Sequence, residues 1–137
     1  MTRVFLDINV ILDVLANREP FADEAEAVLR QVEARAIEGL VAAHTITTLH
    51  FLLAKYVGKA KVRKVLTDLL HVVRVVPVDE DRIRHALAMN WTDFEDAVQA
   101  ACAEKAEAEY FVTRDKRGFK KSPVKIVTPA ELLALVL

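Results

Sequence analysis

The stretch Val4-Phe5-Leu6-Asp7-Ile8-Asn9-Val10 decides how the rest of the chain can be interpreted. Its apolar residues form a short run of the length typical of a buried strand, and the run ends at a carboxylate. In parallel α/β sheets, functional groups gather at the carboxyl ends of the strands. Asp7 is therefore a candidate site residue, although the same aspartate could equally cap a short helix that starts at Val10.

Strand and helix patterns alternate along the 137 residues, which we interpret as one domain spanning 1–137. Short apolar runs predict strands at Arg3–Leu6, Leu40–Ala42, Val72–Val76, Tyr110–Val112 and Val124–Val127. Apolar residues at three- and four-residue spacing predict helices at Val10–Ala16, Ala22–Glu38, Thr45–Tyr56, Lys59–Leu70 and Asp79–Met89, then a helix that ends near Ala108 and a last one after Thr128. This alternation predicts an α/β fold, a three-layer αβα sandwich around a five-stranded parallel sheet.

The composition is that of a folded globular protein, with 53% hydrophobic residues, 28% charged residues and a net charge of −1. No apolar run approaches the roughly 18–20 residues that a membrane-spanning helix needs, so we expect no membrane association. Cys102 is the single cysteine. It excludes an intramolecular disulfide and favours the reducing cytoplasm as the location.

Basic residues gather in two segments, 55–64 and 114–125, where nearly all charges are positive. The second segment begins just after a predicted strand and contains Arg114, Lys116 and Arg117. Such clusters are either solvated surface or contacts for the phosphates of a nucleic acid, and the sequence leaves both interpretations open. Under the second interpretation, these three side chains are the candidate phosphate contacts.

Two aspartates, Asp93 and Asp96, lie three residues apart at the predicted start of a helix and share one face. Thr92 and Glu95 fit a capping box, which accounts for Glu95 but not for the two aspartates. Acids in a first turn often serve only to complement the helix dipole, but three in four positions also repel one another. The pair is therefore a candidate cation site.

Asp115 follows the fourth predicted strand, where a turn would accept an aspartate for purely local reasons. If the first and fourth strands are neighbours, however, Asp7, Asp96 and Asp115 meet at one edge of the sheet. Carboxylates this close repel unless a cation neutralises them, and oxygen-only ligands suit Mg²⁺ or Mn²⁺. Two such ions can clamp the attacking and leaving oxygens of a phosphodiester, so this set of acids favours cleavage of a nucleic acid.

Four motifs occur in order along the chain: Phe5–Asp13, Asp93–Gln99 with the alanine-rich helix that follows, Val112–Asp115 and Val127–Pro129. Together they resemble the PIN domain family, and in particular the VapC-like toxin ribonucleases of type II toxin–antitoxin pairs. The resemblance implies a parallel sheet in the order 3-2-1-4-5 and an Mg²⁺- or Mn²⁺-dependent endoribonuclease that acts on RNA. It also implies a homodimer and an antitoxin partner encoded nearby.

The resemblance assigns roles to individual residues by position. Asp7, Asp96 and Asp115 match the acidic cluster that holds the metal and catalyses cleavage in this family. Asp93 matches an additional acid found in part of the family, and Asn9 matches a small polar residue that supports the site.

Thr48 departs from the family pattern, because a glutamate usually stands at this position of the helix after the second strand. Threonine is a poor, neutral ligand, so the site loses one charge. We expect Asp93 to compensate, while a site that works with fewer carboxylates and an inactive domain remain as alternatives. The inactive domain would be a PIN-like module that binds RNA or a protein partner without cleaving it.

The motif Asp7-Ile8-Asn9-Val10 also resembles the nucleophile motif of haloacid-dehalogenase-type phosphatases. That chemistry needs a second aspartate at position 9 to act as the acid and base. Asn9 cannot exchange a proton in this way, so phosphoryl transfer to Asp7 is the least favoured interpretation.

Overall fold

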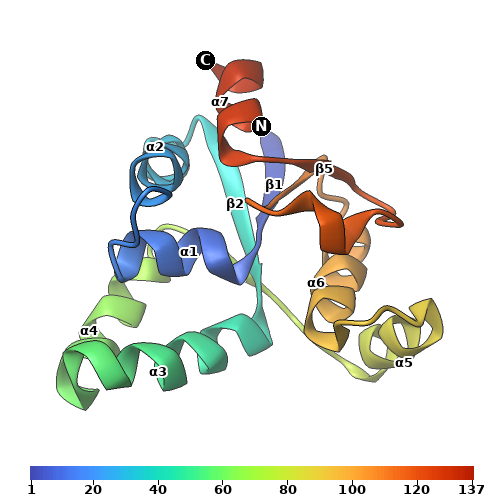
Figure 1. Ribbon diagram of the computed structural model, residues 1–137, viewed down its shortest axis with the longest axis horizontal. Helices are drawn as coiled ribbons and strands as arrows, with labels where there is room; N and C mark the ends of the chain where they lie inside the picture. The colour runs from blue at the N-terminus through green and yellow to red at the C-terminus, as the bar shows by residue number, and fades with distance from the viewer.

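Five parallel strands form one sheet in the order β3-β2-β1-β4-β5 in the computed structural model, which describes residues 1–137 (Figure 1). This arrangement confirms the predicted fold class and the strand order that the resemblance implied. In the central strand, Phe5 is paired with Leu40 on one side and with Phe111 on the other. The strands are β1 (Thr2–Leu6), β2 (Ile37–Ala42), β3 (Arg74–Val76), β4 (Tyr110–Val112) and β5 (Lys125–Val127).

Helices cover both faces of the sheet (Figure 1). One face carries α1 (Ile8–Leu15), α2 (Ala22–Glu33), α3 (Ala43–Val57), α4 (Lys59–Leu69) and α7 (Pro129–Val136). The other face carries α5 (Glu80–Met89), α6 (Phe94–Lys105) and the short 3-10 helix η1 (Lys116–Phe119). None of these helices combines the length and the apolar character that crossing a bilayer requires.

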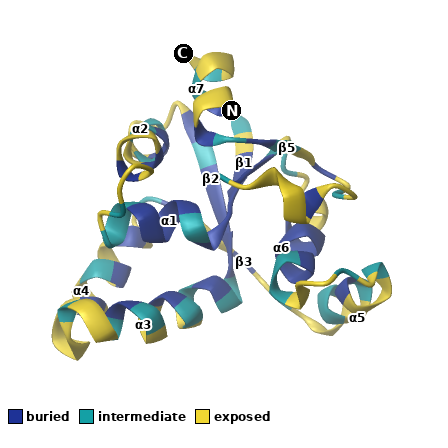
Figure 2. Cartoon of the chain, viewed as in Figure 1, coloured by how far each residue is buried: buried dark blue, intermediate teal, exposed yellow.

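Two hydrophobic cores lie on opposite sides of the sheet because successive side chains of a strand point to opposite faces. Val4 and Leu6 enter the core under α1–α4 and α7, whereas Phe5 enters the core under α5 and α6. There the Phe5 ring stacks on the Phe111 ring, with centroids 5.4 Å apart. Most of β1 and β2 is buried and dark blue in Figure 2, and this packing positions the residues that follow these strands at the carboxyl edge of the sheet.

The second helix ends earlier than the sequence predicted. We expected a helix over Ala22–Glu38, but α2 stops at Glu33 and Arg35 has a φ of 61°, which is incompatible with a continuing right-handed helix. Ile37 then pairs with Thr2 in the sheet. The helical spacing of apolar residues extends to Ala36, which lies beyond the end of α2, and β2 begins at Ile37, before the predicted Leu40.

Several helices also start at other residues than predicted, and α3 begins at Ala43 instead of Thr45. The first helix begins at Ile8 instead of Val10. The prediction of a capping box between Thr92 and Glu95 was wrong. Asp93 is instead the N-cap of α6, and its Oδ1 accepts a hydrogen bond from the Asp96 amide at 3.0 Å. The shift by one residue places Asp96 in the first turn of α6, where it faces the end of β1.

Candidate active site

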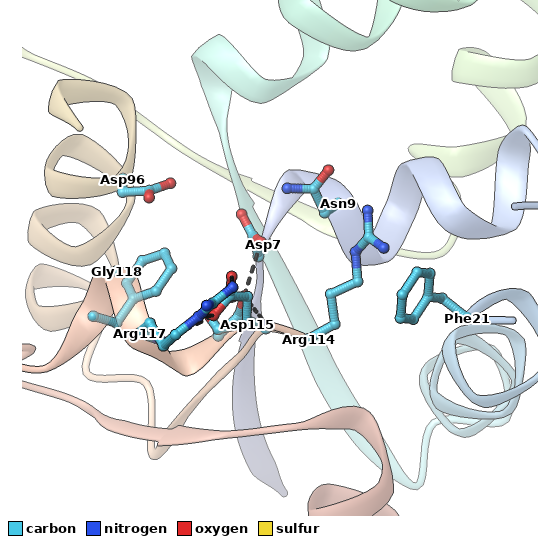
Figure 3. Close-up of a pocket in the computed structure, with 10 residues that line it drawn as sticks. Asp7, Asn9, Phe21, Asp96, Arg114, Asp115, Arg117 and Gly118 are labelled. Carbon is cyan, nitrogen blue, oxygen red and sulfur yellow. Dashed lines mark hydrogen bonds and ion pairs between the residues drawn. The ribbon is translucent and has the colours of Figure 1, made fainter. Parts of the chain in front are cut away.

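A cavity of about 680 Å³ lies where β1, β4 and α6 meet at the carboxyl edge of the sheet (Figure 3). It brings together most of the predicted site residues, from segments far apart in the sequence. Figure 3 shows Asp96 on one side of this space, Arg114 and Phe21 on the other, and Asp7 and Asn9 between them. The cavity is lined by Asp7, Asn9, Phe21, Asp96, Thr113, Arg114, Asp115, Arg117, Gly118 and Phe119.

Asp7 is buried at the end of β1, with 3% of its surface exposed. It occupies the N-cap position of α1, but its side chain makes no capping hydrogen bond. Instead, Oδ1 accepts a hydrogen bond from Gln99 Nε2 and Oδ2 accepts one from the Thr113 hydroxyl, each at 3.0 Å. The alternative role as a helix cap is therefore absent, and both carboxylate oxygens are held at fixed positions.

Gln99 and Thr113 have roles that sequence reasoning missed. Gln99 is fully buried on α6, and its Oε1 accepts the Ile8 amide at 3.1 Å while its amide group donates to Asp7. The Thr113 hydroxyl donates to Asp7 and accepts the Asp115 amide at 3.3 Å, so it links two of the acids. The one signal was Gln99 itself, a polar residue within an otherwise small and apolar helical run.

Uncompensated negative charge perturbs the acids on the α6 side of the cavity. Burial raises the pKa of Asp96, and repulsion from Asp93, Asp7, Glu95 and Asp115 raises it further, to about 7. Burial also raises the pKa of Asp7, and hydrogen bonds from its neighbours offset part of that rise. Thus Asp96 holds a proton at a pH where an ordinary aspartate would be ionised.

The pKa of Asp115 shifts in the opposite direction, because its carboxylate is paired with an arginine. Its carboxylate accepts hydrogen bonds from Arg117 Nε at 3.0 Å, Arg117 Nη2 at 2.9 Å and the Arg117 amide at 3.1 Å. These bonds lower the pKa of Asp115 to about 2. At neutral pH this carboxylate is therefore ionised and paired with the arginine two residues along.

A buried aspartate on α1 pairs with two arginines, one of which, Arg114, lines the cavity opposite Asp96. Asp13 is 1% exposed and forms ion pairs with Arg18 at 2.9 Å and with Arg114 at 3.3 Å. The Arg114 guanidinium lies over the Phe21 ring, 3.9 Å from its centroid. Sequence reasoning gave Asp13 no role, although an acid next to the apolar Ile11-Leu12 pair was an available signal.

Three predicted site residues do not line the cavity. Asp93 caps α6, and Lys116 forms an ion pair with Glu131 at 2.9 Å. The Thr48 hydroxyl donates to the His44 carbonyl within α3 at 3.1 Å. Each of the three side chains therefore already has a partner within the protein.

The family model described as PIN domain matches residues 3–117. The chain belongs to the PIN domain family. This match confirms the resemblance that the four motifs indicated, and it covers all three acids that line the cavity.

Several known proteins are similar to this PIN domain over most of its length. Ribonuclease VapC1 of Aquifex aeolicus is 24% identical over 134 residues, which cover 94% of this chain and 92% of the relative. A toxin–antitoxin complex from Klebsiella pneumoniae contains a chain that superposes with a TM-score of 0.70 at 22% identity, covering 92% of this chain and 97% of that one. A DNA-bound VapBC structure from Salmonella typhimurium gives a TM-score of 0.70 at 16% identity, covering 94% and 99%. The two structural likenesses show the fold.

The acids of this PIN domain fit a hard divalent cation by chemistry but are not assembled around one position. Asp7, Asp96 and Asn9 supply oxygen donors on one cavity, the kind that Mg²⁺ and Mn²⁺ prefer. No three His, Cys, Asp or Glu side chains, however, are grouped so that they could hold an ion. In this arrangement Asp96 is repelled by the other acids, and Asp115 is paired with Arg117.

Proposed function

We propose that this PIN domain is a metal-dependent endoribonuclease, the toxin of a toxin–antitoxin pair, that hydrolyses phosphodiester bonds in RNA. The observation that carries the proposal is the meeting of Asp7, Asp96 and Asp115 on one cavity, with the charge repulsion that raises the Asp96 pKa to about 7. Family membership and the similarity to Ribonuclease VapC1 support this assignment.

Asp7 and Asp96 would hold Mg²⁺ or Mn²⁺, joined by Asp115 once that side chain leaves Arg117. When bound, such an ion supplies a Lewis acid that polarises the phosphodiester and makes water a better nucleophile. We assign Asp93 a supporting part: its Oδ1 is already occupied by the Asp96 amide, and its charge acts on Asp96 through space.

The remaining side chains of the cavity prepare the acids and the substrate. Gln99 and Thr113 fix both oxygens of Asp7, so this carboxylate does not need to reorganise when a cation arrives. Asp96 has to release its proton before it can bind a cation. Arg117, once separated from Asp115, and Arg114 are the positive groups that would contact the phosphates of the RNA.

Replacing the acids tests the proposal directly. We expect Asp7→Asn, Asp96→Asn and Asp115→Asn each to abolish Mg²⁺- or Mn²⁺-dependent cleavage of single-stranded RNA, while Asp68→Asn, an exposed aspartate on α4, leaves it intact. Cleavage that persists in all three site variants would contradict the proposed mechanism.

A second candidate function is a PIN-like module that binds RNA or a protein partner without cleaving. Two observations favour it: no three potential ligands are grouped around one position, and Thr48 replaces the family glutamate and bonds within its own helix. Calorimetric titration with Mn²⁺ separates the candidates. Saturable binding that is lost in Asp96→Asn supports the enzyme, and no binding supports the module.

The partners follow from the same proposal. Solved relatives include a toxin–antitoxin complex from Klebsiella pneumoniae and VapBC from Salmonella typhimurium, which supports an antitoxin as the protein partner of this chain. We also expect a homodimer acting in the cytoplasm. Size-exclusion chromatography with light scattering measures the oligomeric state, and co-expression with the neighbouring reading frame tests for the antitoxin.

A further inference from the structure

Phe21 and Arg114 form a flat, positively charged unit on the side of the cavity opposite Asp96 (Figure 3). The guanidinium carbon lies over the ring, 3.9 Å from its centre, so the charged group contacts the ring face. Phe21 is nevertheless 39% exposed, so part of its ring stays open to solvent beside the guanidinium. The same unit also borders a second cavity of about 270 Å³ on its other side.

An ion pair with the buried Asp13 fixes the position of Arg114. This buried carboxylate binds Arg114 through Nε at 3.3 Å and Arg18 through Nε at 2.9 Å. Arg18 in turn donates through Nη2 to the Asn9 side chain at 3.0 Å, which ties the group to the start of α1. Two arginines share one buried carboxylate, so this side of the cavity keeps an excess of positive charge.

Arg114 keeps donors that the protein does not use. Its one ion pair engages Nε, which leaves both Nη groups able to donate to an incoming acceptor. A planar guanidinium with two free N–H edges matches the oxygens of a phosphate. Asp13 already has Arg18 as a closer partner, so neutralising Asp13 does not by itself require Arg114 at the cavity wall.

We propose that Phe21 and Arg114 form a subsite for the nucleotide that flanks the scissile phosphate, with the base stacked on the exposed part of the Phe21 ring and its phosphate bound by the Arg114 Nη groups. The inference rests on the proposed ribonuclease function. Aromatic rings stack on unpaired bases, and guanidinium groups bind backbone phosphates. Of the two arginines that line the cavity, Arg117 is paired with Asp115, whereas Arg114 has free Nη donors for the backbone next to the acids.

Binding of single-stranded RNA, measured by fluorescence anisotropy without divalent cations in the Asp96→Asn background, tests the subsite separately from cleavage. We expect Phe21→Ala to weaken binding at least about fivefold, since stacking on one aromatic residue is worth that much or more. Arg114→Lys should also weaken binding, because lysine lacks the two Nη groups that would contact the phosphate. Phe21→Tyr, which keeps the ring, should bind as the Asp96→Asn parent does. Phe51→Ala is the matched control, because Phe51 is an exposed aromatic under a cation, Lys55, outside the cavity.

A set of RNAs with one abasic nucleotide, placed at each position in turn, locates the stacked base. At one position the missing base should weaken binding to the Asp96→Asn parent by the same factor as Phe21→Ala weakens binding of the intact RNA. Combining the abasic RNA with the Phe21→Ala variant should weaken binding no further than either change alone. Equal binding by Phe21→Ala and its parent, an undiminished abasic penalty in Phe21→Ala, or no RNA binding by the parent would overturn the proposal. If the subsite behaves as expected but wild-type protein with Mn²⁺ does not cleave RNA, the proposed catalysis fails while the subsite stands.

Discussion

The orientation of Asp7 depends on two buried polar residues, Gln99 and Thr113. Thr113→Val keeps the shape of the side chain but leaves an Asp7 oxygen and the Asp115 amide without their partner. We expect a loss of about 1–3 kcal/mol in the free energy of unfolding, because buried polar groups without partners carry their full desolvation cost. Thr113→Ser, which retains the hydroxyl, should lose much less. Urea denaturation measures both, and equal losses in the two variants would show that the hydroxyl is unimportant.

Asp96 gives the metal-free protein an unusual pH dependence. Its pKa is raised to about 7 in the folded state, so between about pH 4 and 7 the folded protein binds a proton that the unfolded chain has released. Stability should therefore fall as the pH rises through this window, and the raised pKa values of Asp7 and Glu95 act in the same direction. Asp115, with its pKa lowered to about 2, contributes stability that is lost only below about pH 4.

Thermal unfolding in EDTA from pH 5 to pH 8 measures this effect. We expect the melting temperature of the wild type to fall with pH, and that of Asp96→Asn to fall less. Mn²⁺ should stabilise the wild type more at pH 8 than at pH 5, because at the lower pH it has to displace a proton. A melting temperature of the metal-free wild type that rises across this window would contradict the assigned charge repulsion.

The candidate site was partly predictable at the level of single residues. Asp7, Asp96 and Asp115 line one cavity as expected, because carboxyl ends of neighbouring parallel strands share an edge. Gln99, Thr113 and Asp13 were missed because their importance lies in partners distant in sequence, which one sequence does not reveal. Lys116 was predicted as a phosphate contact, but its side chain reaches Glu131 instead.

At the scale of elements, the first turn of α6 determines what Asp93 does. Two residues, Thr92 and Asp93, can each cap a helix, and the sequence pattern favoured Thr92. The backbone places Asp93 at the cap. Asp93→Ala should be about 1 kcal/mol less stable than Asp93→Ser, because serine also caps.

Binding of Mn²⁺ to the Asp93→Ser variant tests whether Asp93 only caps α6 or also binds the metal, as the sequence suggested. We expect affinity close to that of the wild type, because the Asp93 oxygen that faces α6 is used by the Asp96 amide. A large loss of affinity in Asp93→Ser, measured by calorimetry, would make Asp93 a metal ligand after all.

The helix η1 places Arg117 directly on Asp115, so one substitution should change two affinities in opposite directions. Arg117→Gln frees Asp115 for a cation, and we expect Mn²⁺ to bind about two- to fivefold more tightly, the range typical of losing an exposed ion pair. RNA should bind more weakly, because a positive group beside the acids is lost. Lys120→Gln is the control, since Lys120 follows the same helix and does not line the cavity. Both affinities moving in the same direction would contradict the competition between Arg117 and the cation.

At the scale of the whole molecule, the alternation of strands and helices was enough to predict the fold class. The strand order came from the family resemblance, since periodicity does not say which strands are neighbours. Element boundaries were less predictable: α2 ends at Glu33, and the positive φ of Arg35 beyond it is a backbone feature that the apolar spacing does not record. The positions of the carboxylates could not be predicted either, because they reflect a balance of repulsion and pairing between side chains on different elements.

The central claim is that these acids form a metal site where the strands end, and a manganese-soaked crystal tests it most directly. We predict an anomalous peak in contact with Asp7 and Asp96, with Asp115 turned away from Arg117 toward the ion. A soaked crystal with no peak in this cavity, and with Asp115 still paired to Arg117, would contradict the account.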